Sequence, residues 1–269
     1  MVHEIINSTK LFSNEKILIE AKITKTVLFL NKKNGIQKWS WNGDHINATK
    51  YVGEIENGLP HGMGTINFGK GEWIGGEKYI GQWENGKFHG QGTFKWSNGQ
   101  EYTGEFKFGE KDGQGTLIFS NGNKYEGEFK FGKYHGRGVF TFKNGALKIE
   151  KYEGNWINGK YKGIGLYIYK HGDRYIGEFK DYKKHGHGKY NWFQGKEYIG
   201  EFKEDLISGF GILTNPDGSM FIGEYKDGIN WEGTMYNEKG SVIWKIVNGK
   251  RKDNKPFPIF YPKESEKNY

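Results

Sequence analysis

The sequence predicts an all-β fold: an elongated, single-layer antiparallel meander of about eight 23-residue β-hairpin repeats, twisted into a rod-like ribbon with an aromatic groove. Three observations lead to this fold class. An aromatic-x-Gly unit recurs along the chain, large and small or polar residues alternate within each unit, and Asn-Gly or a related pair separates two alternating stretches. Alternation is typical of strands, and Asn-Gly is typical of tight hairpin turns.

The repeat is a unit of 23 residues. The spacings between its first residues are 28, 23, 23, 27, 23, 23 and 23, so the first unit has five additional residues and the fourth has four. One repeat cannot bury its apolar face, and stacked neighbours bury it together. Two strands per repeat predict a rod about 75–80 Å long. The first residues of the units are Tyr51, Tyr79, Tyr102, Tyr125, Tyr152, Tyr175, Tyr198 and Phe221.

Residues 79–101, with the sequence YIGQWENGKFHGQGTFKWSNGQE, contain the unit in full. The first five residues alternate as a strand does. Asn85-Gly86 supplies the two positive-φ residues of a hairpin turn. Residues 90–96 form the expected return strand, and residues 97–99 turn the chain into the next unit. Each repeat is therefore predicted to be one hairpin of a continuous meander.

One face of the predicted sheet is aromatic and lined by glycine. Successive side chains of a strand alternate between faces, so unit positions 1, 3 and 5 share a face, as do positions 12, 14, 16 and 18 of the return strand. We expect the two sets to lie together and form a groove that binds a partner segment. The candidate groove residues are Tyr79, Trp83, Phe94, Trp96, Tyr102, Phe106, Phe119, Tyr125, Phe129, Phe140, Phe142, Tyr152, Trp156, Tyr167, Tyr169, Tyr175, Phe179, Tyr190 and Trp192.

The chain divides into three predicted segments. Residues 1–50 form an N-terminal cap with a degenerate hairpin, residues 51–240 form the repeat array, and residues 241–269 form a C-terminal strap or tail. Residues 1–25 favour neither helix nor strand. The aromatic and prolyl stretch 254–262 is expected to be extended, and it suits either a strap over the last sheet edge or a peptide that docks on a partner. Edge protection favours the strap.

Charge is concentrated at the two ends of the chain. Residues 1–50 carry eight Lys and four acidic residues, and residues 245–269 carry seven Lys/Arg and three acidic residues. The body between them has 25 basic and 25 acidic residues. A nucleic-acid-binding surface needs a positive body, so we expect no nucleic-acid partner. The chain has no cysteine, which excludes disulfides and thiolate zinc sites.

The sequence predicts no catalytic site, no metal site and no cofactor. His61, His89, His135 and His185 share unit position 11 and are therefore expected about 10 Å or more apart, too far for one metal ion. Each Gly-x-Gly pair opens a strand, whereas a phosphate-binding loop opens a helix. The glutamates recur with the repeat, as structural residues do, and no singular nucleophile or carboxylate pair stands out.

The unit resembles a known family. The pattern Y-x-G-E-[WF]-x-x-G-x-x-H-G-x-G, as in YEGEFKFGKYHGRG from Tyr125 to Gly138, is similar to the MORN repeat, named for membrane occupation and recognition nexus. The resemblance covers residues 51 to about 240, although Asp112, Lys162 and Ser208 replace the histidine. It implies a non-catalytic module, since catalysis in such proteins lies in an appended domain. Family members act in cytoskeletal, ciliary and cell-division assemblies and at membrane contact sites, and they are often dimeric.

Two functions from different classes follow. The first is a scaffold whose aromatic groove holds a protein segment, such as a helix, in a cytoskeletal, ciliary or membrane-associated assembly. The alternative is binding to an anionic membrane surface through the basic ends, with Lys250, Arg251 and Lys252 as contacts. No signal-peptide pattern opens the chain, so a cytoplasmic location is expected, at the cytoskeleton, the cilium or the membrane periphery. The sequence does not choose between a monomer and a homodimer.

Overall fold

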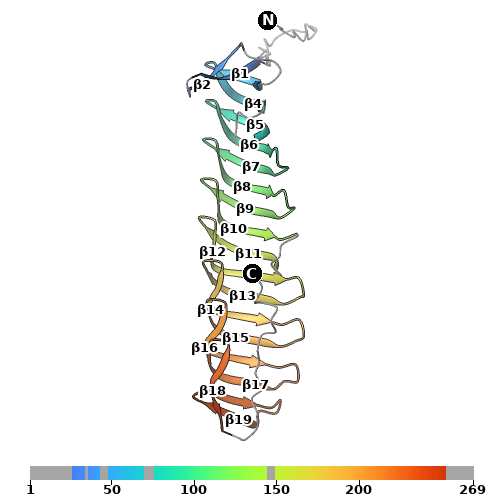
Figure 1. Ribbon diagram of the computed structural model, residues 1–269, viewed down its shortest axis with the longest axis vertical. Helices are drawn as coiled ribbons and strands as arrows, with labels where there is room; N and C mark the ends of the chain where they lie inside the picture. The colour runs from blue at the N-terminus through green and yellow to red at the C-terminus, as the bar shows by residue number, and fades with distance from the viewer. Residues whose placement is uncertain (1–25, 34–35, 43–47, 70–75, 144–148, 253–269) are drawn as a thin grey trace, which may run out of the picture.

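The protein forms one long β-sheet. The computed structural model describes residues 26–33, 36–42, 48–69, 76–143 and 149–252, and in this part of the chain all regular structure is β, in a single sheet of 20 strands. This confirms the predicted fold class. Figure 1 shows the strands stacked like rungs, from the N-terminal end to the C-terminal end of a long twisted ribbon. Residues 1–25 and the predicted tail 254–262 lie outside the described residues.

The strands are five to ten residues long, apart from the last, which has two residues. Their bounds are β1 Thr26–Lys33, β2 Ile36–Ser40, β3 Thr49–Glu56, β4 Leu59–Asn67, β5 Gly76–Glu84, β6 Lys87–Trp96, β7 Glu101–Lys107, β8 Glu110–Ile118, β9 Lys124–Lys130, β10 Lys133–Thr141, β11 Ile149–Ile157, β12 Lys160–Tyr169, β13 Arg174–Lys180, β14 Lys183–Asn191, β15 Glu197–Lys203, β16 Leu206–Thr214, β17 Met220–Lys226, β18 Ile229–Tyr236, β19 Val242–Val247 and β20 Lys250–Arg251.

Strand order follows chain order except at the start. From β3 to β20 each strand pairs antiparallel with the next, so each repeat is one hairpin, as predicted. β1 pairs with both β2 and β3, which leaves β2 at the N-terminal edge of the sheet. In the opening hairpin the first strand, β1, therefore pairs with the next hairpin, whereas in the later hairpins the second strand does so.

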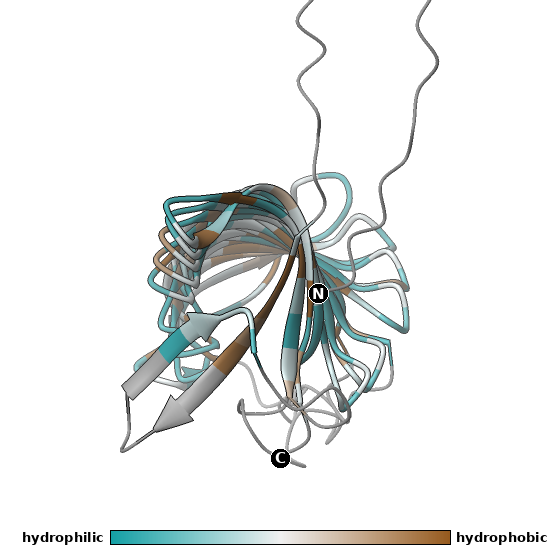
Figure 2. Ribbon diagram, turned by 90° about the horizontal axis from the view of Figure 1, so that it is seen from above, coloured by the Kyte–Doolittle hydropathy of each residue, from teal (hydrophilic) through white to brown (hydrophobic). Residues whose placement is uncertain are grey.

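A two-residue bulge bends the seven hairpins from β3–β4 to β15–β16 at the same place. In β5 and β6, Gly81 pairs with Gly92 and the next residue, Gln82, pairs with His89, so Gly90 and Gln91 are additional on the return strand. Gly90 has a φ of 49°, which a side chain rarely tolerates. A bulge bends the strand and increases its twist. Viewed along the ribbon, the hairpins accordingly curve around one side, with hydrophilic turns at their outer ends (Figure 2).

The first tyrosine of each repeat packs over two glycines. Tyr79 is fully buried, and a Cβ added at Gly81 or Gly92 would lie 2.6 or 2.4 Å from its hydroxyl oxygen. The hydroxyl donates a hydrogen bond to the carbonyl oxygen of Gln82 at 2.8 Å. The same bond, at 2.6–3.1 Å, recurs in all seven repeats that begin with tyrosine. This Tyr–Gly lock therefore holds the two strands of each hairpin at a fixed separation.

A second recurrent contact closes the bulge. The side chain at unit position 4 accepts a hydrogen bond from the backbone N–H at position 13, as Glu105 does from Gln114 at 2.9 Å. Gln82 makes the same bond to Gln91 at 2.8 Å with a neutral amide. The bond therefore needs an oxygen acceptor and not a negative charge. The periodic glutamates are structural residues of the bulge.

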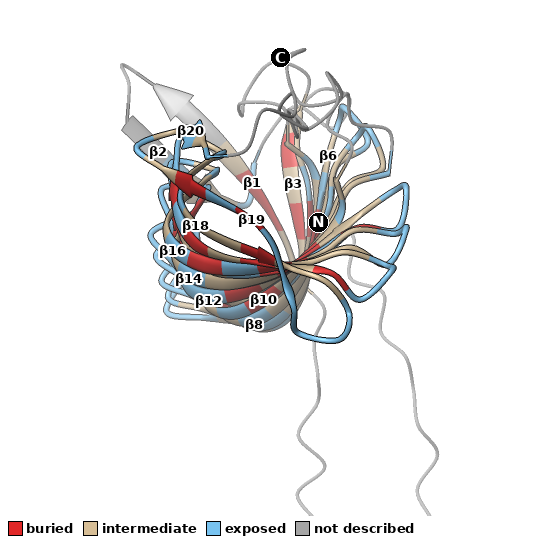
Figure 3. Cartoon of the chain, turned by 90° about the horizontal axis from the view of Figure 1, so that it is seen from below, coloured by how far each residue is buried: buried red, intermediate tan, exposed pale blue. Residues whose placement is uncertain are grey.

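The core is a continuous line of rings along the ribbon. From Tyr79 to Tyr198, each Tyr of position 1 meets the aromatic residue of position 5 edge-to-face in its own repeat and in the next, as Tyr102 does with Phe106 and Phe129 at centroid distances of 5.0 Å. Aromatic pairs in this geometry contribute about 0.5–1.5 kcal/mol beyond the area they bury. Buried residues therefore follow the bend of every hairpin and connect neighbouring repeats (Figure 3).

Gly138→Ala tests the Tyr–Gly lock. Its Cβ would lie 2.3 Å from the Tyr125 hydroxyl oxygen and 2.6 Å from a ring carbon, so we expect a loss of roughly 3 kcal/mol or more in the free energy of unfolding. Gly132→Ala is the control, since its Cβ meets nothing within 4 Å and only its φ of 73° is unfavourable, at about 1–2 kcal/mol. Equal losses in urea denaturation would contradict the steric account.

Glu128→Gln and Glu128→Ala together test the closure of the bulge. The glutamine keeps the acceptor for the Arg137 N–H, so the free energy of unfolding should change by less than about 0.5 kcal/mol. The alanine removes the acceptor and should cost about 1 kcal/mol. A larger loss for glutamine than for alanine, measured by the same denaturation, would show that the charge matters.

Candidate partner-binding face

The nineteen candidate groove residues divide into two sets by burial. All of them lie on one sheet face, which we call the aromatic face. Thirteen are buried in the ribbon's own core, including Tyr79, Trp83 and Tyr102. They support the fold and offer little surface to a partner. The other six pack against this core and stay half-buried, and we call them the aromatic rim: Trp96, Phe119, Phe140, Phe142, Tyr169 and Trp192.

The rim has a regular geometry. Five of its members occupy unit position 18 at the end of successive return strands, so neighbours are about 10 Å apart at two strand spacings. The rings of three members pack against the ring two positions earlier in the same strand. The centroids are 4.5 Å apart for Phe94–Trp96, Phe140–Phe142 and Tyr190–Trp192. The rim is thus a ladder of pre-positioned rings whose orientation is set by the core below. Phe68, which the sequence interpretation left out, extends the ladder by one repeat.

Two lysines lie among these rings. Unit position 10 holds apolar or aromatic residues in most repeats, for example Phe88, Tyr134 and Tyr161, which stack on the first tyrosine. Lys111 and Lys184 occupy the same position in the third and sixth repeats. The sequence interpretation missed them, although a charged residue at an otherwise apolar position of a repeat was a visible signal.

Each of these ammonium groups sits in a cage of three rings. The Lys111 Nζ lies 5.6 Å from the ring centroids of Trp96, Tyr102 and Phe129. Burial lowers the pKa of Lys111. Neither Lys111 nor Lys184 forms an ion pair with a carboxylate among the described residues. The Lys184 Nζ lies 5.8, 5.9 and 4.9 Å from the centroids of Tyr169, Tyr175 and Tyr190.

One carboxylate is buried beside the second cage. Asp173 is 6% exposed and accepts hydrogen bonds from the Tyr190 hydroxyl at 2.7 Å and the Phe193 N–H at 2.8 Å, and its Oδ2 lies 2.8 Å from the His171 Nε2. Burial alone would raise the pKa of Asp173, but these three contacts outweigh it and lower the pKa. The Asp173 carboxylate therefore has three polar partners within the chain.

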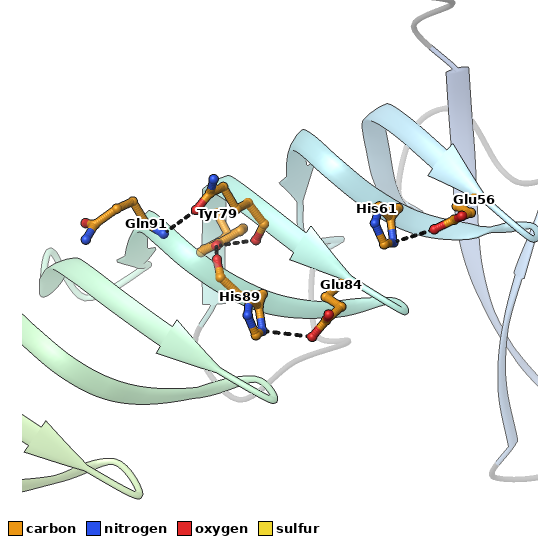
Figure 4. A network of polar contacts seen from close by, with 7 residues as sticks. Glu56, His61, Tyr79, Glu84, His89 and Gln91 are labelled. Carbon is orange, nitrogen blue, oxygen red and sulfur yellow. Dashed lines mark hydrogen bonds and ion pairs between the residues drawn. The ribbon is translucent and has the colours of Figure 1, made fainter.

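The histidines of unit position 11 lie on the return strands near the hairpin turns, one in each of four repeats. The Nδ1 atoms of His61 and His89 are each 3.1 Å from a glutamate of their own hairpin, Glu56 and Glu84 (Figure 4). The His89 carbonyl oxygen also accepts a weak bond from the Tyr79 hydroxyl at 3.4 Å. Within the described residues no three His, Cys, Asp or Glu side chains are grouped closely enough to hold a metal ion.

Other aromatic side chains lie exposed away from the aromatic face. Phe108 and Phe131 occupy hairpin turns with φ near 50° and are 65% and 69% exposed, while Phe193 is 71% exposed in a turn between repeats. Lys107 and Lys130 cover the first two rings at 5.7 and 5.9 Å. The sequence interpretation did not select these residues, because they fall outside the strand periodicity.

The predicted lipid contacts lie at the C-terminal end of the sheet. Lys250 and Arg251 form β20, and Lys252 follows with its N–H bonded to the Lys245 carbonyl oxygen at 3.1 Å. The Arg251 guanidinium lies 4.7 Å from the Trp244 ring centroid, so it also packs on the last core residues. Among the residues that the structure describes, none forms a helix with the length and apolar character of a membrane span.

Comparison with solved structures finds a distant likeness. The SAS-4 (dCPAP) TCP domain of Drosophila melanogaster, solved in complex with a proline-rich motif of Ana2 (dSTIL), is similar over 57% of this chain and 81% of that one. The sequence identity is 9% and the TM-score is 0.37, so the likeness supports no argument about this chain. No curated protein matches the sequence.

Comparison with protein families identifies the repeat. Seven segments match the MORN repeat, which together make up more than half of the chain: residues 51–73, 79–101, 102–124, 125–147, 152–174, 175–196 and 198–220. The structure adds an eighth hairpin, β17–β18, beyond the last match; its repeat begins with Phe221, and it has a one-residue bulge. The chain therefore belongs to the MORN repeat family.

Proposed function

We propose that this protein is a non-catalytic scaffold that binds a segment of a partner protein along the aromatic rim. The observation that carries the proposal is the ladder of half-buried rings at unit position 18, from Trp96 to Trp192. Rings held by a rigid core lose little conformational entropy on binding, and aromatic anchors dominate many interfaces. Membership of the MORN repeat family supports a role in protein interaction or membrane association. A cytoplasmic assembly at the cytoskeleton, the cilium or the membrane periphery would suit such a scaffold.

The rim suits a partner that lies lengthwise on the ribbon. Rings about 10 Å apart match apolar residues at positions i and i+7 of a helix, or every third residue of a polyproline II segment, whose side chains repeat on one side every three residues. Both kinds of segment can place one apolar side chain between successive rim rings. The rim offers a continuous contact over β6 to β14, so affinity would accumulate from several modest contacts.

The first test locates the partner by photo-crosslinking in the source cells. A benzophenone amino acid replaces Trp96, Phe142 or Trp192 in turn, and Phe108 or Phe131, in hairpin turns, in the controls. We expect crosslinks to one partner protein from the three rim positions, in a consistent order along its sequence, because the partner segment follows the ribbon. Crosslinks confined to the control positions would refute the assignment of the binding face.

The second test measures affinity for the crosslinked partner. The triple variant Trp96→Ser, Phe142→Ser, Trp192→Ser should bind at least tenfold more weakly, since each aromatic anchor contributes about 2 kcal/mol or more. The control variant Phe108→Ser, Phe131→Ser, Phe193→Ser removes the same number of rings and should bind within about threefold of the wild type. Thermal unfolding must show that both variants are folded. A rim variant that is folded and binds normally would overturn the proposal.

A second candidate function is binding to an anionic membrane through the C-terminal end. Lys250 and Lys252 are exposed there, and residues 245–269 carry an excess of basic over acidic residues. Lysines near an anionic surface contribute about 1 kcal/mol each. Because the body of the chain has no net charge, such binding would be confined to the ends and would weaken in salt.

Vesicle flotation tests this candidate. Lys250→Gln with Lys252→Gln should reduce partitioning onto phosphatidylserine-containing vesicles about 30-fold at low salt, as two charges of about 1 kcal/mol each are lost. Lys107→Gln with Lys203→Gln removes two exposed lysines from the body and should leave flotation unchanged. Binding that persists in 0.5 M salt, or equal losses in both variants, would rule out this site.

A further inference from the structure

We propose that the partner segment is acidic, and that Lys111 and Lys184 are the two groups on the aromatic face that select it. This inference rests on the proposed function, because it names the chemistry of the segment that would lie on the aromatic rim. Its starting point is the placement of two charged groups at an apolar position of the repeat.

The first step is that the fold does not require these lysines. The same position is occupied by Phe88, Tyr134, Tyr161 and Ile207 in other repeats, where the side chain packs with the core rings. A buried ammonium group loses hydration, which is costly unless an opposite charge replaces it. Three rings offset part of that loss through cation–π attraction. An apolar side chain would serve the core at least as well.

The second step is that no carboxylate of the described chain forms an ion pair with them. Neither ammonium group has a carboxylate oxygen within ion-pair distance. The nearby acidic groups are already engaged: Asp205 accepts the Lys184 backbone N–H at 2.8 Å, and Asp112 accepts the Phe131 N–H at 3.3 Å. Asp173 is held by its three contacts. Burial of the Lys111 ammonium group without an ion-pair partner lowers the pKa of Lys111.

The third step is that both lysines border the aromatic rim. The Lys111 cage includes the rim residue Trp96, and the Lys184 cage includes the rim residue Tyr169. Lys111 is itself half-buried, so its ammonium group adjoins the surface on which a partner segment would lie. Lys184 is 5% exposed and its Nζ donates a hydrogen bond to the Tyr169 hydroxyl at 3.4 Å, so it would act on a partner from just below that surface. Lys196 adds a third cation on this side, with its Nζ 5.1 Å from the Trp192 centroid. Three lysine ammonium groups therefore lie among the rings of the aromatic face.

The spacing of the two cages constrains the partner. Lys111 lies on β8 and Lys184 on β14, six strand spacings apart, or about 29 Å. An extended segment covers that distance in about nine residues, and a helix in about 19. A segment that reaches both cages thus carries acidic residues at one of these separations, with apolar residues between them for the rim rings.

The experiment selects peptides from a random phage-displayed 20-residue library on the full-length protein. Asp and Glu should be enriched in peptides that bind the wild type and fail to bind the rim variant Trp96→Ser, Phe142→Ser, Trp192→Ser. The selected peptides should bind Lys111→Met with Lys184→Met at least tenfold more weakly. Thermal unfolding of that double variant should occur at the same or a higher temperature, because methionine suits the core and removes a buried charge.

The matched control is Lys107→Met with Lys203→Met, which changes the net charge equally at exposed positions. It should bind the selected peptides within about threefold of the wild type. Equal losses in both double variants would mean that net charge alone attracts the peptides, and the inference would be overturned. The single variant Lys111→Met gives the same test if Lys184→Met proves unstable.

The outcomes separate this inference from the function on which it rests. Peptides that need the rim but show no acidic enrichment would overturn the role of the lysines and leave the binding face in place. Enrichment of Lys or Arg would also overturn it, since the cages would then accept a partner's cation. Peptides that bind the rim variant as well as the wild type would refute the proposed function and this inference together.

Discussion

The structure depends on one contact, the packing of a tyrosine ring over two facing glycines. In the seven repeats that begin with tyrosine, the ring covers a glycine on its own strand and a glycine on the return strand, and its hydroxyl donates to a backbone carbonyl group three residues on. The ring fills the space that two side chains would occupy in an ordinary sheet. A single-layer sheet obtains a core in this way without a second layer to cover it. The line of edge-to-face rings is built on these tyrosines, and the bulge next to each glycine pair bends the hairpin around them.

The lock also decides which aromatic residues remain accessible. A ring at unit position 1 or 5 lies inside the bend and is used by the fold. A ring at position 18 lies past the bend, at the end of the return strand, where no later strand covers it. The same aromatic face is therefore core near the glycines and partly exposed near the strand end, where the proposed binding surface lies. Residues of the second kind are the ones that natural selection can vary for a partner without loss of the fold.

The two caged lysines bear on specificity. A ladder of rings alone would bind many apolar segments, because rings tolerate a range of apolar side chains. Charged groups set into the ladder at two defined places add a requirement that most apolar segments do not meet, and a mismatch leaves a buried cation without a partner. The repeat architecture suits this arrangement, since one position can change in one repeat while its neighbours keep the sheet intact.

The sequence by itself determined the architecture: the 23-residue period, the hairpin in each repeat and the shared face of Tyr79, Trp83, Phe94 and Trp96. These features are local, because strand alternation and Asn-Gly turns act within one repeat. Every repeat carries the same signals, so the same hairpin forms along the whole array. Only the tertiary structure decided the rest. It placed β1 between β2 and β3, separated buried rings from rim rings, and enclosed Lys111 and Lys184 among aromatic side chains. The burial of a side chain depends on the bend of the sheet and on contacts with neighbouring repeats. The sequence of one repeat does not contain this information.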